Sequence, residues 1–289
     1  MHLTVLAPAK LNLFLEILGK RNDNYHIINS IMQTVSLFDE VTVWNENNKK
    51  ISVSCTDDTI PCDNSNTAYK AAEIFFADTG IENTGIGIKI KKRIPSQAGM
   101  AGGSSDAAAV LVALNEMFHT EKTIDELADM AEQVGADVPF CLYGGTMNAS
   151  GIGTILSPLP DLPECYFLVV KPSINISTKE AYKKADDLGY NDCEDVENMA
   201  ESICNGSLKS ISKHIYNKFE TVMAIDEIEN IKRFMLDNGA MGAAMTGSGS
   251  AVFGLFENKD EAEDCFKILE QEFEEIYILT PTAEGCKII

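Results

Sequence analysis

Residues 94–118 read IPSQAGMAGGSSDAAAVLVALNEMF, a loop rich in glycine and serine that runs directly into an apolar helix. Glycines at positions 99, 102 and 103 allow a close backbone approach that a side chain would block. A helix N-terminus has unpaired N–H groups and a partial positive charge, so it attracts anions. The stretch therefore predicts a phosphate-binding loop. A flexible loop before a serine-capped helix, with Asp106 favourable to the helix dipole, also fits the pattern.

The common nucleotide-binding motifs are absent from the sequence. No GxxxxGK[ST] pattern occurs anywhere in the chain, and no GxGxxG pattern opens a dinucleotide-binding unit. If the loop binds a nucleotide, it does so in another type of fold.

Size and charge limit the classes of function. The 289 residues exceed the about 100–150 residues that one core usually needs, so two domains are expected. The chain is 45% hydrophobic and 23% charged, the ordinary balance of a folded protein. Its 23 basic residues oppose 44 acidic ones, and the net charge of −21 repels nucleic acid and anionic membranes. A small anion can still bind at a locally basic site, because salt screens the wider field within about 8 Å.

The cysteines and the N-terminus predict a cytoplasmic protein. The eight cysteines form no CxxC pair, and no histidine spacing completes a zinc site, so we expect reduced thiols. The first 18 residues have no basic leader or cleavage site, and Lys10 and Glu16 interrupt the apolar run. Neither export nor a membrane span is expected.

Hydrophobic periodicity predicts an α+β fold in two domains, residues 1–160 and 161–289. In the first half we expect a helix that ends before Gly80, a helix over 123–135 with Thr123 and Glu126 as a capping box, and no helix in the glycine-rich segment after 135. Strands are expected at residues 3–7, 11–18, 41–45, 51–55 and 86–92. In the second half we expect several helices between 178 and 238, one helix over 259–273, and strands at 165–172, 242–246, 250–256 and 275–280.

Three motifs resemble those of the GHMP small-molecule kinases. The segment IPSQAGMAGGSSDAAA resembles the second motif of that family, P-x3-G-L-x-G-G-S-S-x-A-A, with Met100 in place of the usual leucine and Ala101 where some members have glycine. Residues 8–35 resemble the first motif and AMTGSGSAVFGLF, 244–256, the third. The resemblance implies an N-terminal domain like ribosomal protein S5, which binds ATP, and a ferredoxin-like C-terminal domain.

The resemblance also implies the residues that carry out phosphoryl transfer. Asp137 matches the catalytic aspartate, and Lys10 matches a lysine near that aspartate and the acceptor hydroxyl. Ser104 and Ser105 can offer hydroxyls to phosphate or to Mg²⁺, and Ser105 is the candidate metal ligand. Each has a plain alternative: a turn residue for Asp137, a solvated strand lysine for Lys10, and helix capping for the serines. The implied ATP-binding residues are Asn66, Lys92, Pro95, Ala98, Gly99, Met100, Ala101, Gly102, Gly103, Ser104 and Ser105.

Residues around 8–26 and 135–153 are most similar to family members that act on a cytidine diphosphate methylerythritol in isoprenoid precursor biosynthesis. By this resemblance Tyr25 and Tyr182 would sandwich the cytosine while His26 bonds its edge, and Asn12 would contact the erythritol phosphate. The third motif would close over the reaction centre with Thr246, Gly247, Ser248 and Gly249. Ordinary packing remains an alternative for both tyrosines, and a strand-connecting turn for the loop.

Three other functions remain open. A related kinase acting on homoserine, mevalonate or a sugar needs the same ATP loop but has no use for a cytosine-binding Tyr-His pair. A non-catalytic nucleotide-binding protein would be expected to lack Asp137 or Lys10, and both are present. A ribosome-associated module is disfavoured by the net charge. The expected ligands are ATP, Mg²⁺ and a small-molecule acceptor, with the chain a monomer or homodimer.

Overall fold

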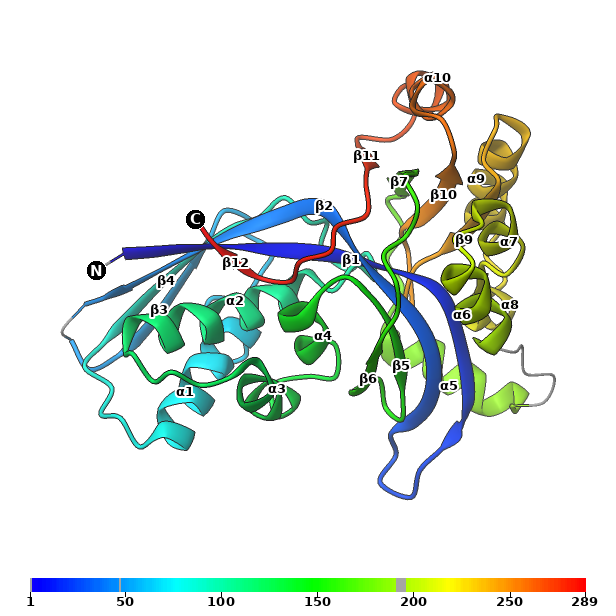
Figure 1. The fold of residues 1–289 in the computed structure, drawn as a ribbon. Coiled ribbons are helices and arrows are strands. Elements are labelled where there is room, and N and C mark those ends of the chain that lie inside the picture. The colour runs from blue at the N-terminus through cyan, green and yellow to red at the C-terminus, as the bar shows by residue number, and fades with distance from the viewer. Residues whose placement is uncertain (1, 47, 191–195) are drawn as a thin grey trace.

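The computed structural model describes residues 2–46, 48–190 and 196–289, which form two sheets with helices packed around them (Figure 1). Cys193, one of the eight cysteines expected to be reduced, lies outside the described residues. The observed mixture confirms the α+β expectation.

The first sheet is built on a long hairpin of two strands, β1 (His2–Lys20) and β2 (His26–Asn45). The sheet order is β12-β1-β2-β4-β3, with β5 paired to β2, β6 to β5 and β8 to β1. Breaks in register at Pro8/Ala9, Asn12/Phe14 and Ile17/Gly19 accompany the bend of the hairpin toward the C-terminal half. The remaining strands of this sheet are β3 (Ile51–Cys55), β4 (Ile86–Lys91), β5 (Thr146–Ser150), β6 (Ile155–Pro158), β8 (Tyr216–Asn217) and β12 (Lys287–Ile288).

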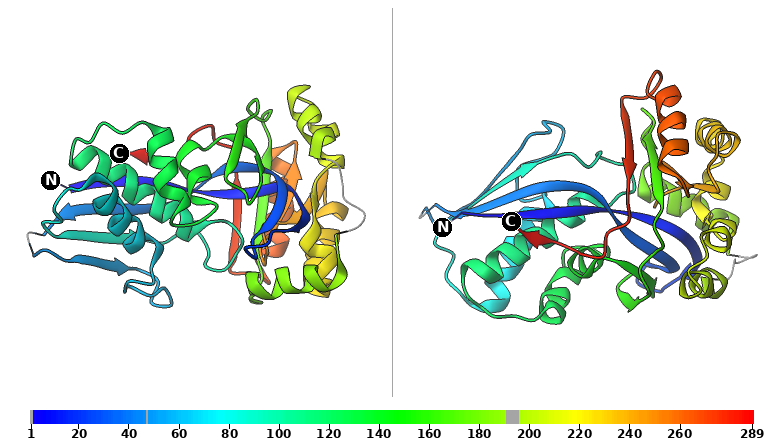
Figure 2. Two further views of the ribbon diagram at one scale, coloured as in Figure 1. Left: turned by 90° about the horizontal axis from the view of Figure 1, so that it is seen from below. Right: turned by 45° about the horizontal axis from the view of Figure 1, so that its top comes forward.

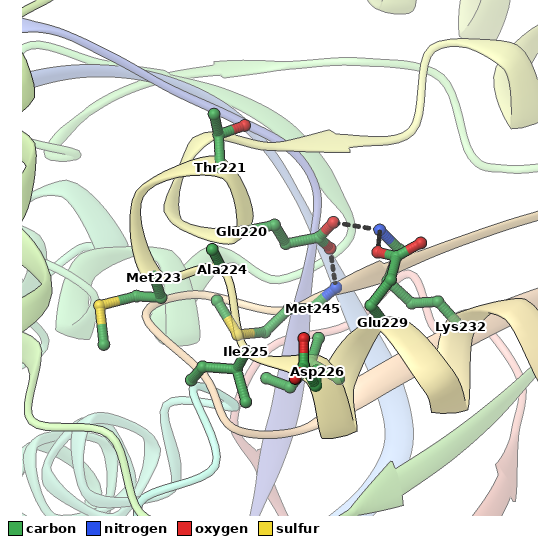
Figure 3. Close-up of a pocket in the computed structure, with 10 residues that line it drawn as sticks. Glu220, Thr221, Met223, Ala224, Ile225, Asp226, Glu229, Lys232 and Met245 are labelled. Atoms are coloured by element: carbon green, nitrogen blue, oxygen red, sulfur yellow. Dashed lines mark hydrogen bonds and ion pairs between the residues drawn. The ribbon is translucent and has the colours of Figure 1, made fainter.

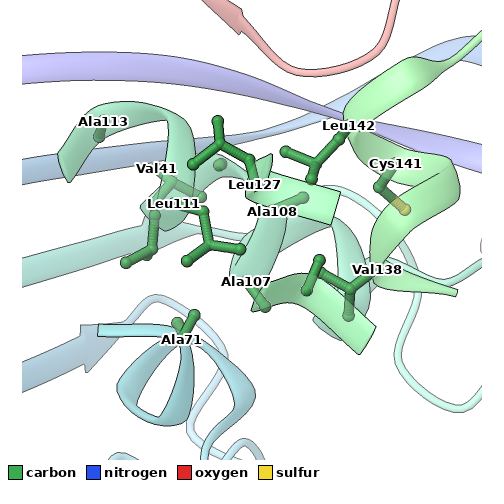
Figure 4. Close-up of a cluster of buried hydrophobic side chains, with 14 of the residues drawn as sticks. Val41, Ala71, Ala107, Ala108, Leu111, Ala113, Leu127, Val138, Cys141 and Leu142 are labelled. Atoms are coloured by element: carbon green, nitrogen blue, oxygen red, sulfur yellow. The ribbon is translucent and has the colours of Figure 1, made fainter. Parts of the chain in front are cut away.

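Four helices cover one face of the first sheet (Figure 1): α1 (Thr67–Thr79), α2 (Gly102–Met117), α3 (Ile124–Glu132) and α4 (Val138–Tyr143). Helix α2 is central because its alanines let β1, β2 and α1 approach closely. Figure 4 shows the resulting core, where Ala107, Ala108 and Leu111 lie among side chains from α1, α3, α4 and β2. The loop before α2 is thereby fixed to a rigid element.

Local sequence signals explain most helix boundaries. Asn66 caps α1 by accepting from the Ala68 N–H, and Gly80 ends it in a left-handed conformation. The capping box of Thr123 and Glu126 at the start of α3 is confirmed.

Two expectations about helices were wrong. Helix α4 lies within the segment judged too rich in glycine, because the apolar run VPFCLY is buried, Pro139 suits a first turn, and Gly144 and Gly145 come only after the helix. The serine-capped alternative for α2 also fails, because the N-cap is Ala101 in a left-handed conformation and no side chain caps the helix.

The second sheet has the order β11-β7-β10-β9. Its strands are β7 (Tyr166–Lys171), β9 (Gly242–Met245), β10 (Val252–Phe256) and β11 (Glu275–Leu279). One face packs on α9 (Asp226–Asp237) and α10 (Lys259–Leu269). The other packs on α6 (Val196–Cys204), α7 (Leu208–Lys213) and the β1–β2 hairpin. Helices α5 (Thr178–Leu188) and α8 (Lys218–Met223) contact each other beside the same hairpin.

The two halves share a core, and the C-terminal half adds strands to the first sheet. Side chains of β1 and β2, including Leu11 and Val35, belong to the same buried cluster as Phe167 and Phe253 of the second sheet. Strands β8 and β12, both beyond residue 160, pair with β1, and Figure 2 shows the C-terminus returning to the first sheet. The division at residues 160/161 remains a prediction.

Candidate active site

A cleft of about 770 Å³ lies where the loop before α2, the middle of β1 and the loop after β9 meet. Most residues predicted to bind ATP or the acceptor line it: Lys10, Asn12, Lys92, Pro95, Ala98, Gly99, Met100, Ala101, Gly102, Gly103, Ser104, Asp137, Tyr182, Gly247, Ser248 and Gly249. The fold therefore brings together segments separated by more than 200 residues.

The glycine loop is anchored to the strands on both sides. The Lys10 N–H donates to the Met100 carbonyl at 3.1 Å, and the Ala251 N–H donates to the Ala98 carbonyl at 3.2 Å. Gly99 has a φ of 75°, and a Cβ there would lie 2.1 Å from the Thr246 carbonyl oxygen. Only glycine fits this position, so the loop can pass directly over the end of β9.

Lys10 and Asp137 face each other across the cleft. Lys10 Nζ donates to Asn12 Oδ1 at 2.5 Å and lies 3.7 Å from Asp137 Oδ2. Asp137 is the N-cap of α4 but makes no capping hydrogen bond, so the turn and cap alternative does not account for its carboxylate. The Lys10 side chain is 3% exposed and that of Asp137 is 34% exposed. The alternative of a solvated strand lysine for Lys10 is therefore wrong.

Lys92 is buried between two carboxylates at the base of the glycine loop. Its Nζ pairs with Asp39 and, at 2.9 Å, with Asp106 Oδ2. Asp39 also accepts from the N–H groups of Arg93 and Ile94, so it holds the start of the loop. Burial raises the pKa of Asp106 to about 7 against the opposing attraction of Lys92. Lys92 is thus a structural ion-pair residue rather than a solvated lysine, and its contact with ATP remains a prediction.

Two predicted ATP-binding residues do not line the cleft. Asn66 is buried, caps α1 and donates to the Pro61 carbonyl. Ser105 is fully buried beside the thiols of Cys141 and Cys286, whereas Ser104 reaches the cleft. For Asn66 and Ser105 the structure shows packing and capping roles, and their ligand contacts remain predictions.

The predicted cytosine-binding residues gather at the far end of the hairpin. The His26 ring stacks on Tyr182 with ring centroids 4.2 Å apart, and His26 Nε2 lies 2.7 Å from Asp186 Oδ1. Asp186 also accepts from Lys20 Nζ at 2.6 Å and from the Tyr190 hydroxyl, and these donors hold the pKa of its carboxyl well below its usual range. Tyr25 is 57% exposed. His26 therefore covers one face of Tyr182, and neither His26 nor Tyr25 lines the cleft.

The third motif closes the cleft from the second sheet. Thr246 is fully buried and accepts from the Asn12 N–H at 2.9 Å, while Gly247, Ser248 and Gly249 line the cleft. Ser248 Oγ also lies 2.8 Å from Thr178 Oγ1 at the start of α5.

Several residues that line the cleft were not predicted from the sequence. Phe219 and the segment Ile176, Ser177 and Thr178 line the acceptor side, and Thr59, Ile60 and Pro61 line the side of the glycine loop. None lies in a recognisable motif. Asp39 stands beside a second acid, Glu40, in the stretch SLFDEV, so the local sequence did not mark it as part of a buried ion pair.

Comparisons with known proteins show the family to which the chain belongs. The model of the GHMP kinases N terminal domain matches residues 66–145, and that of the GHMP kinases C terminal domain matches residues 199–275. The chain belongs to the GHMP kinase family and has its two-domain fold. Members of this family are small-molecule kinases that use ATP.

Several relatives carry the same name. A 4-diphosphocytidyl-2-C-methyl-D-erythritol kinase of Clostridium tetani is 41% identical over 276 residues, 95% of this chain and 98% of that protein. One of Caldicellulosiruptor bescii is 42% identical over 281 residues, 96% of this chain and 98% of that protein. A crystal structure of a 4-(cytidine 5'-diphospho)-2C-methyl-D-erythritol kinase matches with a TM-score of 0.80 and 31% identity over 96% of this chain and 98% of that one.

The fold alone does not select among these kinases. A homoserine kinase from Cytophaga hutchinsonii also matches with a TM-score of 0.80, at 22% identity, covering 100% of this chain and 97% of that one. Within the described parts of the chain, none of the helices is both long and apolar enough to cross a membrane.

Proposed function

We propose that the chain transfers the γ-phosphoryl group of ATP to the 2-hydroxyl of 4-diphosphocytidyl-2-C-methyl-D-erythritol, giving ADP and the 2-phosphate, in non-mevalonate isoprenoid precursor biosynthesis. The observation that carries the proposal is the Lys10–Asp137 pair in the same cleft as the N-terminus of α2. The relatives at about 40% identity act, by name, on this acceptor.

The phosphates of ATP would lie on the glycine loop. The N-terminus of α2 lies at the cleft, and its unpaired N–H groups carry the positive partial charge of the helix. Gly102, Gly103 and Ser104 therefore suit a phosphate tail. By the family resemblance, Asn66 and Lys92 would lie near the adenosine. A group of ATP that reaches Lys92 would meet an ammonium already paired with Asp39 and Asp106. The contribution of Lys92 would therefore be to position the ligand.

Mg²⁺ would enter with ATP. Among the residues that the structure describes, no group of three or more His, Cys, Asp or Glu side chains could hold a metal ion. Mg²⁺ usually needs only one or two protein oxygens besides phosphates and waters, and the Ser104 hydroxyl supplies one in the cleft. Bound there, it would neutralise phosphate charge. Ser105 could serve as a ligand only after leaving its buried position.

Transfer then requires alignment and charge stabilisation. The 2-hydroxyl oxygen attacks the γ-phosphorus, the bond to the β–γ bridging oxygen breaks, and ADP leaves. Asp137 orients the hydroxyl and accepts its proton, and Lys10 stabilises the charge that develops. Because Lys10 is almost fully buried, its ammonium acts in a region that excludes water.

The acceptor would extend from Asn12 toward the tip of the hairpin. Tyr182, stacked against His26, offers one aromatic platform, and the exposed Tyr25 can swing over a base from the other side. The loop from Thr246 to Gly249 would cover the reacting end. A cytoplasmic location is also proposed, supported by the free thiols of the seven cysteines in the described ranges.

A coupled ADP-release assay tests the proposal. The chain is offered ATP and Mg²⁺ with the cytidylyl acceptor, homoserine, mevalonate or a sugar in parallel. Turnover is expected with the cytidylyl acceptor alone. Faster turnover with another acceptor would reassign the substrate within the family, and no turnover with any acceptor would contradict the proposed function.

A further inference from the structure

Asn217 occupies the junction of β8 and α8, next to the cleft but outside its lining. Strand β8 pairs with β1, with Asn217 opposite Leu15, and the Asn217 side chain is buried. Its amide nitrogen donates to the carbonyls of Met245 at 2.6 Å and Gly247 at 2.8 Å. Its amide oxygen accepts from the Phe219 N–H at 2.9 Å and so caps α8. One side chain thus ties the first sheet to the third-motif loop.

The two carbonyls that Asn217 holds flank Thr246. The Thr246 hydroxyl accepts from the Asn12 N–H at 2.9 Å and lies 3.4 Å from the Gly99 carbonyl oxygen. Asn12 in turn accepts from Lys10 Nζ at 2.5 Å. Asn217 thus holds the backbone on both sides of Thr246, Thr246 bonds Asn12, and Asn12 bonds Lys10, which faces Asp137.

A second contact from α8 reaches the same loop from behind. Glu220, one turn after Asn217, accepts from the Met245 N–H and pairs with Lys232 of α9 (Figure 3). These residues line a separate cavity of about 390 Å³ on the far side of Met245. Since Glu220 and Asn217 hold the N–H and the carbonyl of the same residue, the end of β9 is fixed at both backbone groups.

We propose that Asn217 is a positioning residue for phosphoryl transfer, which acts through Thr246 and Asn12 to place the Lys10 ammonium against Asp137 and the acceptor hydroxyl. The inference rests on the proposed kinase function. Asn217 itself does not touch the substrates. The competing account is that Asn217 is only the N-cap of α8, in which case its loss lowers stability and leaves the chemistry unchanged.

Two substitutions separate these accounts. Asn217→Ser keeps a good helix cap but is too short to hold both loop carbonyls. Asn217→Asp keeps the shape and the cap but has no donor, so it turns an acceptor toward two carbonyls. Asn258→Ser is the matched control, because Asn258 is also a helix N-cap, is exposed, makes no side-chain capping bond and lies at the start of α10.

Steady-state kinetics at a temperature well below each variant's midpoint of unfolding provide the readout. We expect Asn217→Ser to lower kcat at least tenfold, and Asn217→Asp to lower it further. The KM for ATP should change less than about threefold, and Asn258→Ser should match the parent. Unchanged kcat in Asn217→Ser, with only a lower midpoint of unfolding, would overturn the proposal in favour of capping.

A double-mutant cycle tests the route through Thr246. Thr246→Val removes the hydroxyl that Asn12 bonds, so the double variant should be about as slow as the slower single variant. Multiplicative effects would show that Asn217 acts independently of Thr246 and would contradict the route.

Amide hydrogen exchange tests the role of Asn217 without depending on activity. If the parent turned over no acceptor, that result would contradict the proposed function, and the exchange rates would still show whether Asn217 orders the loop. The N–H groups of Thr246 and Gly249 are hydrogen-bonded within the loop. Asn217→Ser should speed their exchange at least tenfold relative to Asn258→Ser. Equal exchange in the two variants would show that Asn217 does not order this loop.

Discussion

Lys10 Nζ lies 3.7 Å from Asp137 Oδ2, with the lysine almost fully buried and the aspartate open to the cleft. The pair joins two elements distant in sequence, since Lys10 is in β1 and Asp137 precedes α4. The ammonium is already bound to Asn12 and the carboxylate makes no capping bond, so Asp137 is free to meet a substrate hydroxyl. The pair thus combines a fixed cation, Lys10, with an accessible base, Asp137.

Asp137→Asn should separate binding from chemistry. The amide keeps the shape of the side chain but neither takes a proton nor balances Lys10. We expect turnover to fall by about 10² or more while substrate binding changes less than about tenfold. Steady-state kinetics and calorimetric titration with a non-hydrolysable ATP analogue measure the two quantities.

Asp129→Asn on the exposed face of α3 is the control for this experiment and should retain parental activity. Equal losses of binding and turnover in Asp137→Asn would indicate a structural role for Asp137.

Sequence patterns predicted this site better where the signal was local. The Gly80 C-cap of α1 and the capping box of α3 depend on neighbouring residues, and both are confirmed. The glycine loop was also predicted from a local pattern and lines the cleft, while its phosphate contacts remain a prediction. Helix α4 was missed because its helicity depends on burial of Val138, Phe140 and Leu142 rather than on propensity. The roles of Asp39 and Asn217 were not predictable from local sequence, since their partners lie more than 25 residues away.

Gly99→Ala should disable the phosphate loop. A Cβ at this position would lie 2.1 Å from the Thr246 carbonyl oxygen, in addition to the strain of a φ of 75°. We expect a loss of stability of roughly 2–3 kcal/mol and at least a tenfold fall in kcat/KM for ATP, because the loop must move off the end of β9.

Gly80→Ala is the matched control for the glycine loop. Gly80 has a similar φ of 69°, but a Cβ there meets nothing within 4 Å. It should cost about 1 kcal/mol of backbone strain and leave kinetics unchanged. Denaturant unfolding and ATP kinetics on both variants check the difference. If Gly99→Ala behaves like Gly80→Ala, the contact with Thr246 does not constrain the site.

Asp186→Asn should weaken acceptor binding selectively. Asp186 holds His26 at 2.7 Å and Lys20 at 2.6 Å, and thereby keeps the His26 ring on Tyr182. The variant loses the charge that attracts Lys20 and replaces the carboxylate oxygen that bonds His26. We expect KM for the cytidylyl acceptor to rise about fivefold to tenfold and KM for ATP to stay constant. The exposed neighbour, varied as Asp187→Asn, should show neither change, and a parallel rise in both KM values would refute a local effect.

The same carboxylate contributes to acid sensitivity. The pKa of Asp186 is depressed by Lys20, Tyr190 and His26, so its stabilising effect is present above the carboxyl's unfolded pKa of about 4. That effect is lost as the pH falls toward the depressed folded pKa. The Asp186→Asn variant should therefore show a shallower loss of stability below pH 4 than the parent in thermal unfolding.

Asp106 has the opposite pH dependence. Its buried carboxyl faces Lys92 and Asp39, with the thiols of Cys141 and Cys286 nearby, and burial raises its pKa to about 7. The unfolded value is about 4, so the folded state binds the extra proton between pH 4 and 7. The stability that this proton provides is present below pH 4 and is lost as the pH rises through about 7.

Asp106→Asn removes this titration, because an amide does not ionise. The free energy of unfolding of the variant, minus that of the parent, should therefore increase from pH 5 to pH 8 by an amount of order 1–3 kcal/mol. Urea unfolding at four pH values measures the slope, and Asp58→Asn, an exposed aspartate, should show none. A difference that stays flat over this range would mean that Lys92 keeps Asp106 ionised, and the buried cluster would then carry two carboxylate charges against one ammonium.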